Sequence, residues 1–198
     1  MMISGKQLKA LASLASKDPN RPMLCSLWLD RAPCGNLRLW VTDGHQLCQM
    51  VLEETGEFHV TGLPISFCLD GISRLKAKDV VFLSAIHGLE FNGAPLPTVE
   101  DLTPPDINMV IPEAASCDGG GPRSFGIGFG IMARVSKVVC AIGNREQSVR
   151  FQCGNDDLSP IRYDFPVYSE DGLQCIRVTG VIMPVRIDKE AIWEKVAA

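Results

Sequence analysis

The sequence predicts an α+β protein in which a short strand, a helix and a group of strands recur along the chain. Three segments follow this order. In each, apolar residues recur every three or four positions over the helical part, and the stretches that follow alternate apolar with polar residues. We therefore expect repeated strand-helix-strand units, with the helices on one face of antiparallel sheets.

The predicted helices begin near Ser4, Ser66 and Met132. Ser4 suits the position that caps a helix N-terminus, because its hydroxyl can accept a hydrogen bond from a free backbone N–H of the first turn. Each helix carries an apolar stripe on one side and basic residues on the other. The apolar residues are Leu8, Leu11, Leu14 and Ala15 in the first helix, Phe67, Ile72 and Leu75 in the second, and Val135, Val138 and Val139 in the third.

Between and after the helices the sequence favours strands, because β-branched and aromatic residues alternate there with polar ones and turn residues separate the runs. The expected strands cover residues 24–29, 37–42, 47–52, 58–60, 80–84, 89–91, 108–111, 149–153, 161–165 and 175–187.

A linker is predicted at residues 116–124, where three consecutive glycines precede a proline. It divides the chain into a complete module of two half-repeats, residues 1–115, and a partial module, residues 125–198. Alternating glycines follow at residues 125–131. They match neither the dinucleotide-binding nor the P-loop pattern, so we interpret this run as a strand with one glycine face.

Composition limits the class of protein. At 198 residues, 46% of them hydrophobic, the chain can bury a substantial core. It has no apolar run long enough to span a membrane and no signal-peptide pattern at its start, so we expect a cytoplasmic protein without a membrane partner. None of its eight cysteines shows the C-x-x-C spacing of metal or redox sites. We expect no disulfide, metal or cofactor.

The charge distribution is more informative than the net charge of −4. An acidic balance argues against a nucleic-acid partner, yet the predicted helices contain basic residues and almost no acidic ones. Basic helix faces are usually only solvated, but the same segregation would suit a ring with a basic bore. The candidate DNA-facing residues are Lys6, Lys9, Lys17, Arg74, Lys78, Arg134 and Lys137.

Three motifs resemble segments of the bacterial β sliding clamp, the processivity factor of DNA polymerase III. VTDGHQL at residues 41–47 is similar to the family's A-T-D-G-H-R-L-A strand-turn segment, and VIMPVRI at residues 181–187 is similar to its C-terminal M-P-M-R-L strand. TPPDINMVIP at residues 103–112 resembles its F-P-D-Y-x-x-V-L-P segment. Either of the first two motifs alone would also fit a β-turn or a buried strand; their joint occurrence favours the family.

The resemblance implies the DNA-clamp fold, non-specific encircling of duplex DNA, and a hydrophobic pocket that binds peptides of DNA polymerases and clamp loaders. Two departures, Gln46 for the usual Arg and Val185 for the usual Met, suggest altered partner preference. The implied pocket residues are Leu27, Thr42, Gly44, His45, Leu47, Pro105, Val110, Val181, Met183, Pro184 and Val185.

The family's first domain and half of its third have no counterpart in this chain. Its reduced length suggests a clamp of phage or mobile-element origin. Because unpaired sheet edges are rarely left exposed, we expect a homo-oligomeric ring. A tetramer would complete the usual set of units, with a dimer or trimer as alternatives.

Two other function classes fit parts of the sequence. Asp43 and His45 alternate along the chain and could orient an imidazole as a general base, but no nucleophile motif or carboxylate pair accompanies them, so we expect no enzyme. The second alternative is a clamp-like module that does not encircle DNA and competes for clamp-binding peptides. Basic helix faces distinguish the two, because a pure peptide binder does not need them.

Overall fold

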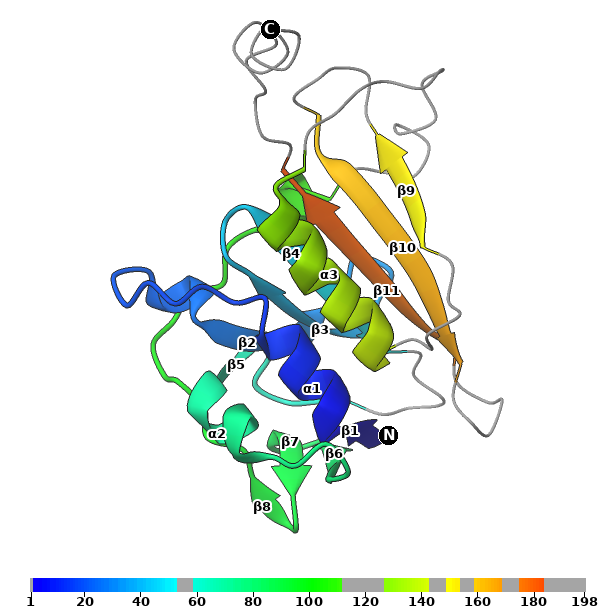
Figure 1. Cartoon of the computed structure of the whole chain (residues 1–198). Helices are drawn as coiled ribbons and strands as arrows, with labels where there is room; N and C mark the ends of the chain where they lie inside the picture. The colour runs from blue at the N-terminus through cyan, green and yellow to red at the C-terminus, as the bar shows by residue number, and fades with distance from the viewer. Residues whose placement is uncertain are drawn as a thin grey trace, which may run out of the picture.

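The computed structural model describes residues 2–52, 59–111, 127–142, 149–153, 159–168 and 175–183. The predicted linker at 116–124 and the pocket residues Pro184 and Val185 lie outside them. The described residues form two antiparallel sheets and three α-helices, which confirms the α+β prediction. Figure 1 shows α1 and α3 side by side in front of the larger sheet, with α2 near the smaller one.

The helices begin where their sequences can cap or accommodate them. Ser4 forms a capping box with Gln7 at the start of α1, which satisfies two backbone donors as predicted. Described helical segments comprise α1 (Gly5–Ala12), α2 (Leu69–Arg74) and α3 (Phe129–Ile142), with short 3-10 turns η1 (Pro22–Leu24) and η2 (Ile107–Met109).

The smaller sheet has the order β1-β6-β7-β8 and the larger one the order β5-β2-β3-β4-β11-β10-β9. Every strand pair in both sheets is antiparallel. The strands are β1 (Met2–Ser4), β2 (Ser26–Arg31), β3 (Leu37–Thr42), β4 (Gln46–Leu52), β5 (Ile65–Cys68), β6 (Val80–Ser84), β7 (Gly88–Phe91), β8 (Ala94–Pro95), β9 (Arg150–Cys153), β10 (Ile161–Tyr168) and β11 (Cys175–Ile182).

The larger sheet contains strands from both parts of the chain. Within it β4 pairs with β11, and the predicted linker lies between these two strands in the sequence. On the helix side of this sheet, one apolar core contains Leu8 and Leu11 of α1, Val138 of α3, and the inward residues of the strands. Successive strand residues point to opposite faces, so the same strands also present a second face away from the helices.

A close approach of side chain to backbone occurs in the centre of the larger sheet. Gly180 of β11 pairs with Tyr163 of β10, and the Tyr163 ring lies where a Cβ on residue 180 would stand. The ring is fully buried, so β11 needs glycine at this position.

The structure corrects several predicted elements. Residues 107–109 form a 3-10 turn instead of a strand, because they cross over the larger sheet without joining it. Phe129–Ile131 begins α3, so this part of the glycine-alternating run is helical. The second helix starts at Leu69, not near Ser66, because residues 65–68 pair with β2 as strand β5.

Candidate functional site

The tight turn between β3 and β4 is held by its own side chains. The Asp43 carboxylate accepts hydrogen bonds from the backbone N–H groups of His45 and Gln46, both at 2.9 Å. The Thr42 hydroxyl accepts from the Gly44 N–H at 3.1 Å and donates to the Gln46 carbonyl at 2.8 Å. Gly44 has φ +91°, a backbone conformation that favours glycine. The turn therefore presents Gly44 and His45 in a fixed geometry.

β11 brings the C-terminal motif directly against this turn. Val181 pairs with Leu47, and Ile182 pairs with Gln46. Beyond the strand, the Met183 N–H donates to the His45 carbonyl at 2.9 Å. Two motifs that are far apart in the sequence thus lie side by side in the larger sheet. We call this contact the junction.

The third motif covers the same junction on the face away from the helices. Ile107 of η2 is buried against Trp28, Trp40, Leu47 and Val181, and Leu102 and Ile111 pack around this group, which we call the outer apolar cluster. The two tryptophan rings stack with centroids 5.7 Å apart. All three resembling motifs therefore contribute to one apolar cluster.

Arg38 fixes the covering segment to the sheet. Its guanidinium donates to both carboxylate oxygens of Asp30, at 2.6 and 3.0 Å, and to Gln49 at 3.2 Å. It also donates to the Asn108 side-chain oxygen at 2.8 Å, one residue after Ile107. Since the Arg38 side chain is only 3% exposed, this bidentate pair is largely shielded from water.

The pocket residues differ in how far they reach the surface. Leu47 and Val181 are 3% and 1% exposed, so they form a floor beneath Ile107. Met183 and Val110 remain 38% and 40% exposed, while Gly44 and His45 are exposed and Pro105 is half-buried. The surface that a partner could contact therefore consists of Met183, Val110, Gly44 and His45, while Leu47 and Val181 lie covered beneath. We call these four exposed residues the rim.

Leu27 does not belong to the pocket, contrary to the prediction. It is fully buried in the helix-side core, because Trp28 and not Leu27 points toward the outer apolar cluster. The residues that sequence reasoning missed are Trp28, Trp40 and Ile107. The tryptophans could have been found from alternation, since Trp28 and Trp40 occupy facing positions on β2 and β3.

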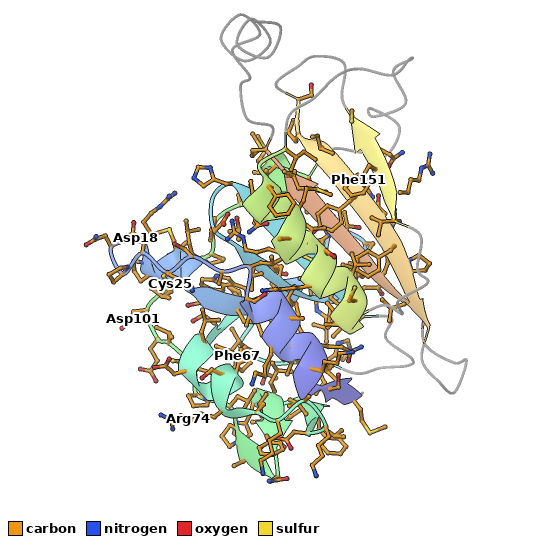
Figure 2. All side chains as sticks on the ribbon, in the orientation of Figure 1. Asp18, Cys25, Phe67, Arg74, Asp101 and Phe151 are labelled. Atoms are coloured by element: carbon orange, nitrogen blue, oxygen red, sulfur yellow. The ribbon has the colours of Figure 1, made fainter. Side chains whose placement is uncertain are left out.

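The candidate DNA-facing residues lie on the three helices and the chain next to them. Lys6 and Lys9 are exposed on α1, where their ammonium groups donate to the carbonyls of Cys140 and Leu75. Arg74 is on the last turn of α2, with Lys78 before β6, and Figure 2 shows the Arg74 side chain projecting away from the sheets. Lys17 and Lys137 are exposed beside the turn of residues 43–45. These positions are distributed over the helix side of the fold.

Arg134 differs from the other cations because it already has a carboxylate partner. Its guanidinium donates to the Asp43 carboxylate at 2.9 Å. Asp43 also holds the turn, so this ion pair links α3 to the junction with β11. The charge distribution made Arg134 a candidate DNA-facing residue, but its guanidinium is paired with a carboxylate of the protein itself.

Titratable groups outside the junction do not form a catalytic arrangement among the described residues. Burial raises the pKa of the Cys48 thiol to about 12. Such a thiol is not a nucleophile at neutral pH. No group of three or more His, Cys, Asp or Glu side chains in the described segments could hold a metal.

An ionic network lies on the outer face, on β10 and β11. Burial alone would raise the pKa of Asp164. Hydrogen bonds from Arg162 and Thr179, with the charges of Arg162 and Arg177, outweigh it and lower that pKa below its ordinary value. The Thr179 hydroxyl donates to the Asp164 carboxylate at 2.6 Å and Arg162 at 2.7 Å. Asp164 is therefore a structural carboxylate.

The described segments contain no helix that is both long and apolar enough to span a membrane.

No known family model matches the sequence, and no curated protein matches it. Solved structures do match. The β subunit of DNA polymerase III from Thermotoga maritima is 14% identical with a TM-score of 0.58, and 94% of this chain covers 65% of it. The DNA polymerase sliding clamp of Bacillus subtilis is 13% identical with a TM-score of 0.58, over 94% of this chain and 64% of that one. That of Pseudomonas aeruginosa is 17% identical with a TM-score of 0.57, over 94% and 66%.

At these identities the likeness establishes the fold: this chain has the sliding-clamp fold. It spans about two thirds of the length of those clamps.

Proposed function

We propose that this protein is a non-enzymatic DNA sliding clamp of the cytoplasm. In this proposal it encircles duplex DNA without sequence preference and binds short peptides of DNA polymerases and clamp loaders at the outer apolar cluster. The convergence of three motifs carries the proposal: residues 42–47, 102–111 and 181–183 meet on one side of one sheet.

Peptide binding at this site agrees with its composition. Met183 is exposed directly after β11, and Met109 and Val110 are exposed on the segment that covers the cluster; unbranched methionine side chains can repack around different apolar anchors. Gly44 is exposed and, with φ +91°, presents its backbone at the edge of the site. In this proposal Thr42, Gly44, His45, Leu47, Pro105, Val110, Val181 and Met183 contact the peptide or support those that do, together with Pro184 and Val185, which follow Met183 in the sequence.

Encircling DNA is supported by the helix side of the fold, where basic residues follow α1, α2 and α3. Sequence-independent contacts to phosphates require only such a surface. Lys6, Lys9, Lys17, Arg74, Lys78 and Lys137 are proposed to face the duplex, and Arg134 to do so only if it leaves Asp43.

A ring is supported by open sheet edges. Within the described residues, β9 pairs on one side only, and Phe151 on it is 38% exposed. We propose a homo-oligomer, with a tetramer favoured, built from the modules 1–115 and 125–198.

The ion pair of Arg134 with Asp43 favours a second candidate, because it occupies one of the cations proposed to face DNA and ties it to the turn beside the peptide site. This second candidate is a peptide-binding module that competes for clamp-binding motifs.

The decisive experiment measures binding of a fluorescent peptide with two apolar anchors to Met183→Asp. A dissociation constant of about 1 μM is expected for the unchanged protein, since so small a contact supports only modest affinity. Met183→Asp should abolish binding while the protein stays folded, because Met183 is 38% exposed. Phe82→Asp is the matched control, since Phe82 is 49% exposed on the smaller sheet. Equal binding by both variants would reject the site.

Two further measurements separate the candidates. Light scattering gives the oligomer mass, and a monomer at micromolar concentration would exclude the ring. Retention on nicked circular DNA should fall when Lys9 and Lys137 are both replaced by Glu, and should weaken with salt. Peptide binding by a monomer that does not retain DNA would establish the competing module.

A further inference from the structure

A hollow of about 820 Å³ opens beside the turn of residues 43–45, on the opposite side from the outer apolar cluster. Its walls are the end of α1 with the chain that follows, the outward side of α3, and the turn itself. Lys17, Arg21 and Lys137 line it, with His45 at its rim. We call it the cationic groove.

The cationic groove has more positive than negative charge. Its lining includes four permanent cations, Lys17, Arg21, Arg134 and Lys137, and two carboxylates, Asp18 and Asp43. The two carboxylates balance two of these four positive charges, and neither forms an ion pair with a lysine among the described residues. Asp43 is paired with Arg134 and the turn, and Asp18 accepts two hydrogen bonds from Asn20.

Three cations therefore remain available. Within the described residues, Lys17, Arg21 and Lys137 form none of the ion pairs, and all three are exposed. In a chain whose net charge is −4, this concentration of unpaired cations favours an anionic ligand.

The groove and the outer apolar cluster share the turn as a common wall. The Arg21 guanidinium lies against Gly44, since a Cβ built there would be 3.2 Å from its nearest nitrogen. Two residues later, the carbonyl of Met23 accepts a hydrogen bond from the Trp28 indole at 2.9 Å. Trp28 belongs to the outer apolar cluster. Residues 21–23 therefore connect the two sites.

We propose that the cationic groove binds carboxylate side chains that flank the apolar anchors of a partner peptide. The preferred partner is then an apolar motif followed or preceded by Asp or Glu. This inference rests on the proposed peptide binding at the outer apolar cluster. Arg21 can bind a carboxylate through two parallel hydrogen bonds, and Lys17 and Lys137 add point charges.

The location of Arg21 favours a peptide over DNA. Lys17 and Lys137 of the groove are also among the residues proposed to face DNA, so Arg21 is the residue that distinguishes the two ligands. It packs on the turn that rims the peptide site and is not one of the proposed DNA-facing residues. A peptide that passes over Gly44 and His45 would come next to the groove, because His45 lines it.

The test uses two fluorescent peptides with the same apolar anchors. One carries Glu and Asp beside the anchors, and the other carries Gln and Asn. At low salt the acidic peptide should bind about tenfold more tightly, as expected for one or two charge-assisted hydrogen bonds. In the Arg21→Gln/Lys137→Gln double variant, the ratio of the two dissociation constants should fall to about one. Lys76→Gln, an exposed lysine away from the groove, should retain the tenfold ratio.

The outcomes are distinguishable. Equal binding of the two peptides by the unchanged protein overturns the inference and leaves the proposed peptide site intact. Binding of neither peptide removes both. If the double variant keeps the tenfold ratio but loses retention on nicked circular DNA, the groove serves DNA and the inference is wrong.

Discussion

The two faces of the larger sheet are built from the same strands but are organised differently. The helix face is apolar from β2 to β10 and belongs to one core. The outer face instead carries the outer apolar cluster next to ionic groups, which are Arg38 with Asp30 and Asp164 with Arg162. Adjacent residues of one strand therefore serve stability in different ways. The comparison indicates that peptide binding is to be sought on the outer face, where apolar and charged side chains lie together.

The largest effect is expected from Arg38 on the outer face. Arg38→Met leaves the Asp30 carboxylate without its partner and removes the bond to Asn108, so the free energy of unfolding should fall by about 3–5 kcal/mol. Urea denaturation measures it. The double variant Arg38→Met/Asp30→Leu should recover most of the loss, because no unpaired charge remains. A double variant as unstable as Arg38→Met would show that packing, not charge, dominates this face.

The neighbouring residue tests the helix face. Leu39→Ala opens a cavity in the core and should lower the free energy of unfolding by about 2–5 kcal/mol. In contrast to Arg38→Met, no single second substitution should restore the lost stability. Leu39→Met, which conserves volume, should cost less than about 1.5 kcal/mol. Similar losses for Ala and Met would contradict a packed helix face.

Gly180 tests how closely the sheet packs on its helix side. Gly180→Ala places a methyl group against the Tyr163 ring and should cost about 1–3 kcal/mol. Tyr163→Leu in addition should relieve the overlap, although it loses the ring's own packing. Thermal unfolding of the single and double variants measures the energetic coupling between positions 163 and 180. Additive effects on stability would show that the methyl group and the ring do not overlap.

The smallest effect is a pH dependence from Asp164. Its pKa is lower in the folded protein than its ordinary value of 3.8, so its contribution is present above about pH 4 and is lost as the pH falls further. Asp164→Asn should therefore flatten the acid side of the stability profile, measured by urea denaturation between pH 2 and 6. An unchanged slope in this variant would assign the acid sensitivity to other carboxylates.

The sequence predicted the helix face better than the outer face. Apolar spacing located α1 and its cap at Ser4, because local pattern and capping chemistry determine both. The outer face depends on register, and a shift of one residue exchanges the two faces of a strand. Leu27 was therefore assigned to the wrong face, while Trp28 was overlooked.

Other features of the site required tertiary information. The pairing of Leu47 with Val181 followed from resemblance, not from periodicity, because nothing local specifies which distant strand is adjacent. Residues 107–109 contain apolar residues typical of a strand, yet they form a 3-10 turn held by Arg38 through Asn108. The burial of Leu47 depends on that segment and could not be read from its own neighbours in the sequence.

The pairing of β4 with β11 also fixes when the site can exist. A ribosome releases the chain from its N-terminus, so β4 emerges long before the strand that lies beside it. Contacts between such distant segments form slowly, since a long loop must close first. A nascent or prematurely terminated chain would thus have β1 to β8 available but no binding rim. Partners could therefore bind at this rim only after β11 has been synthesised and has paired with β4.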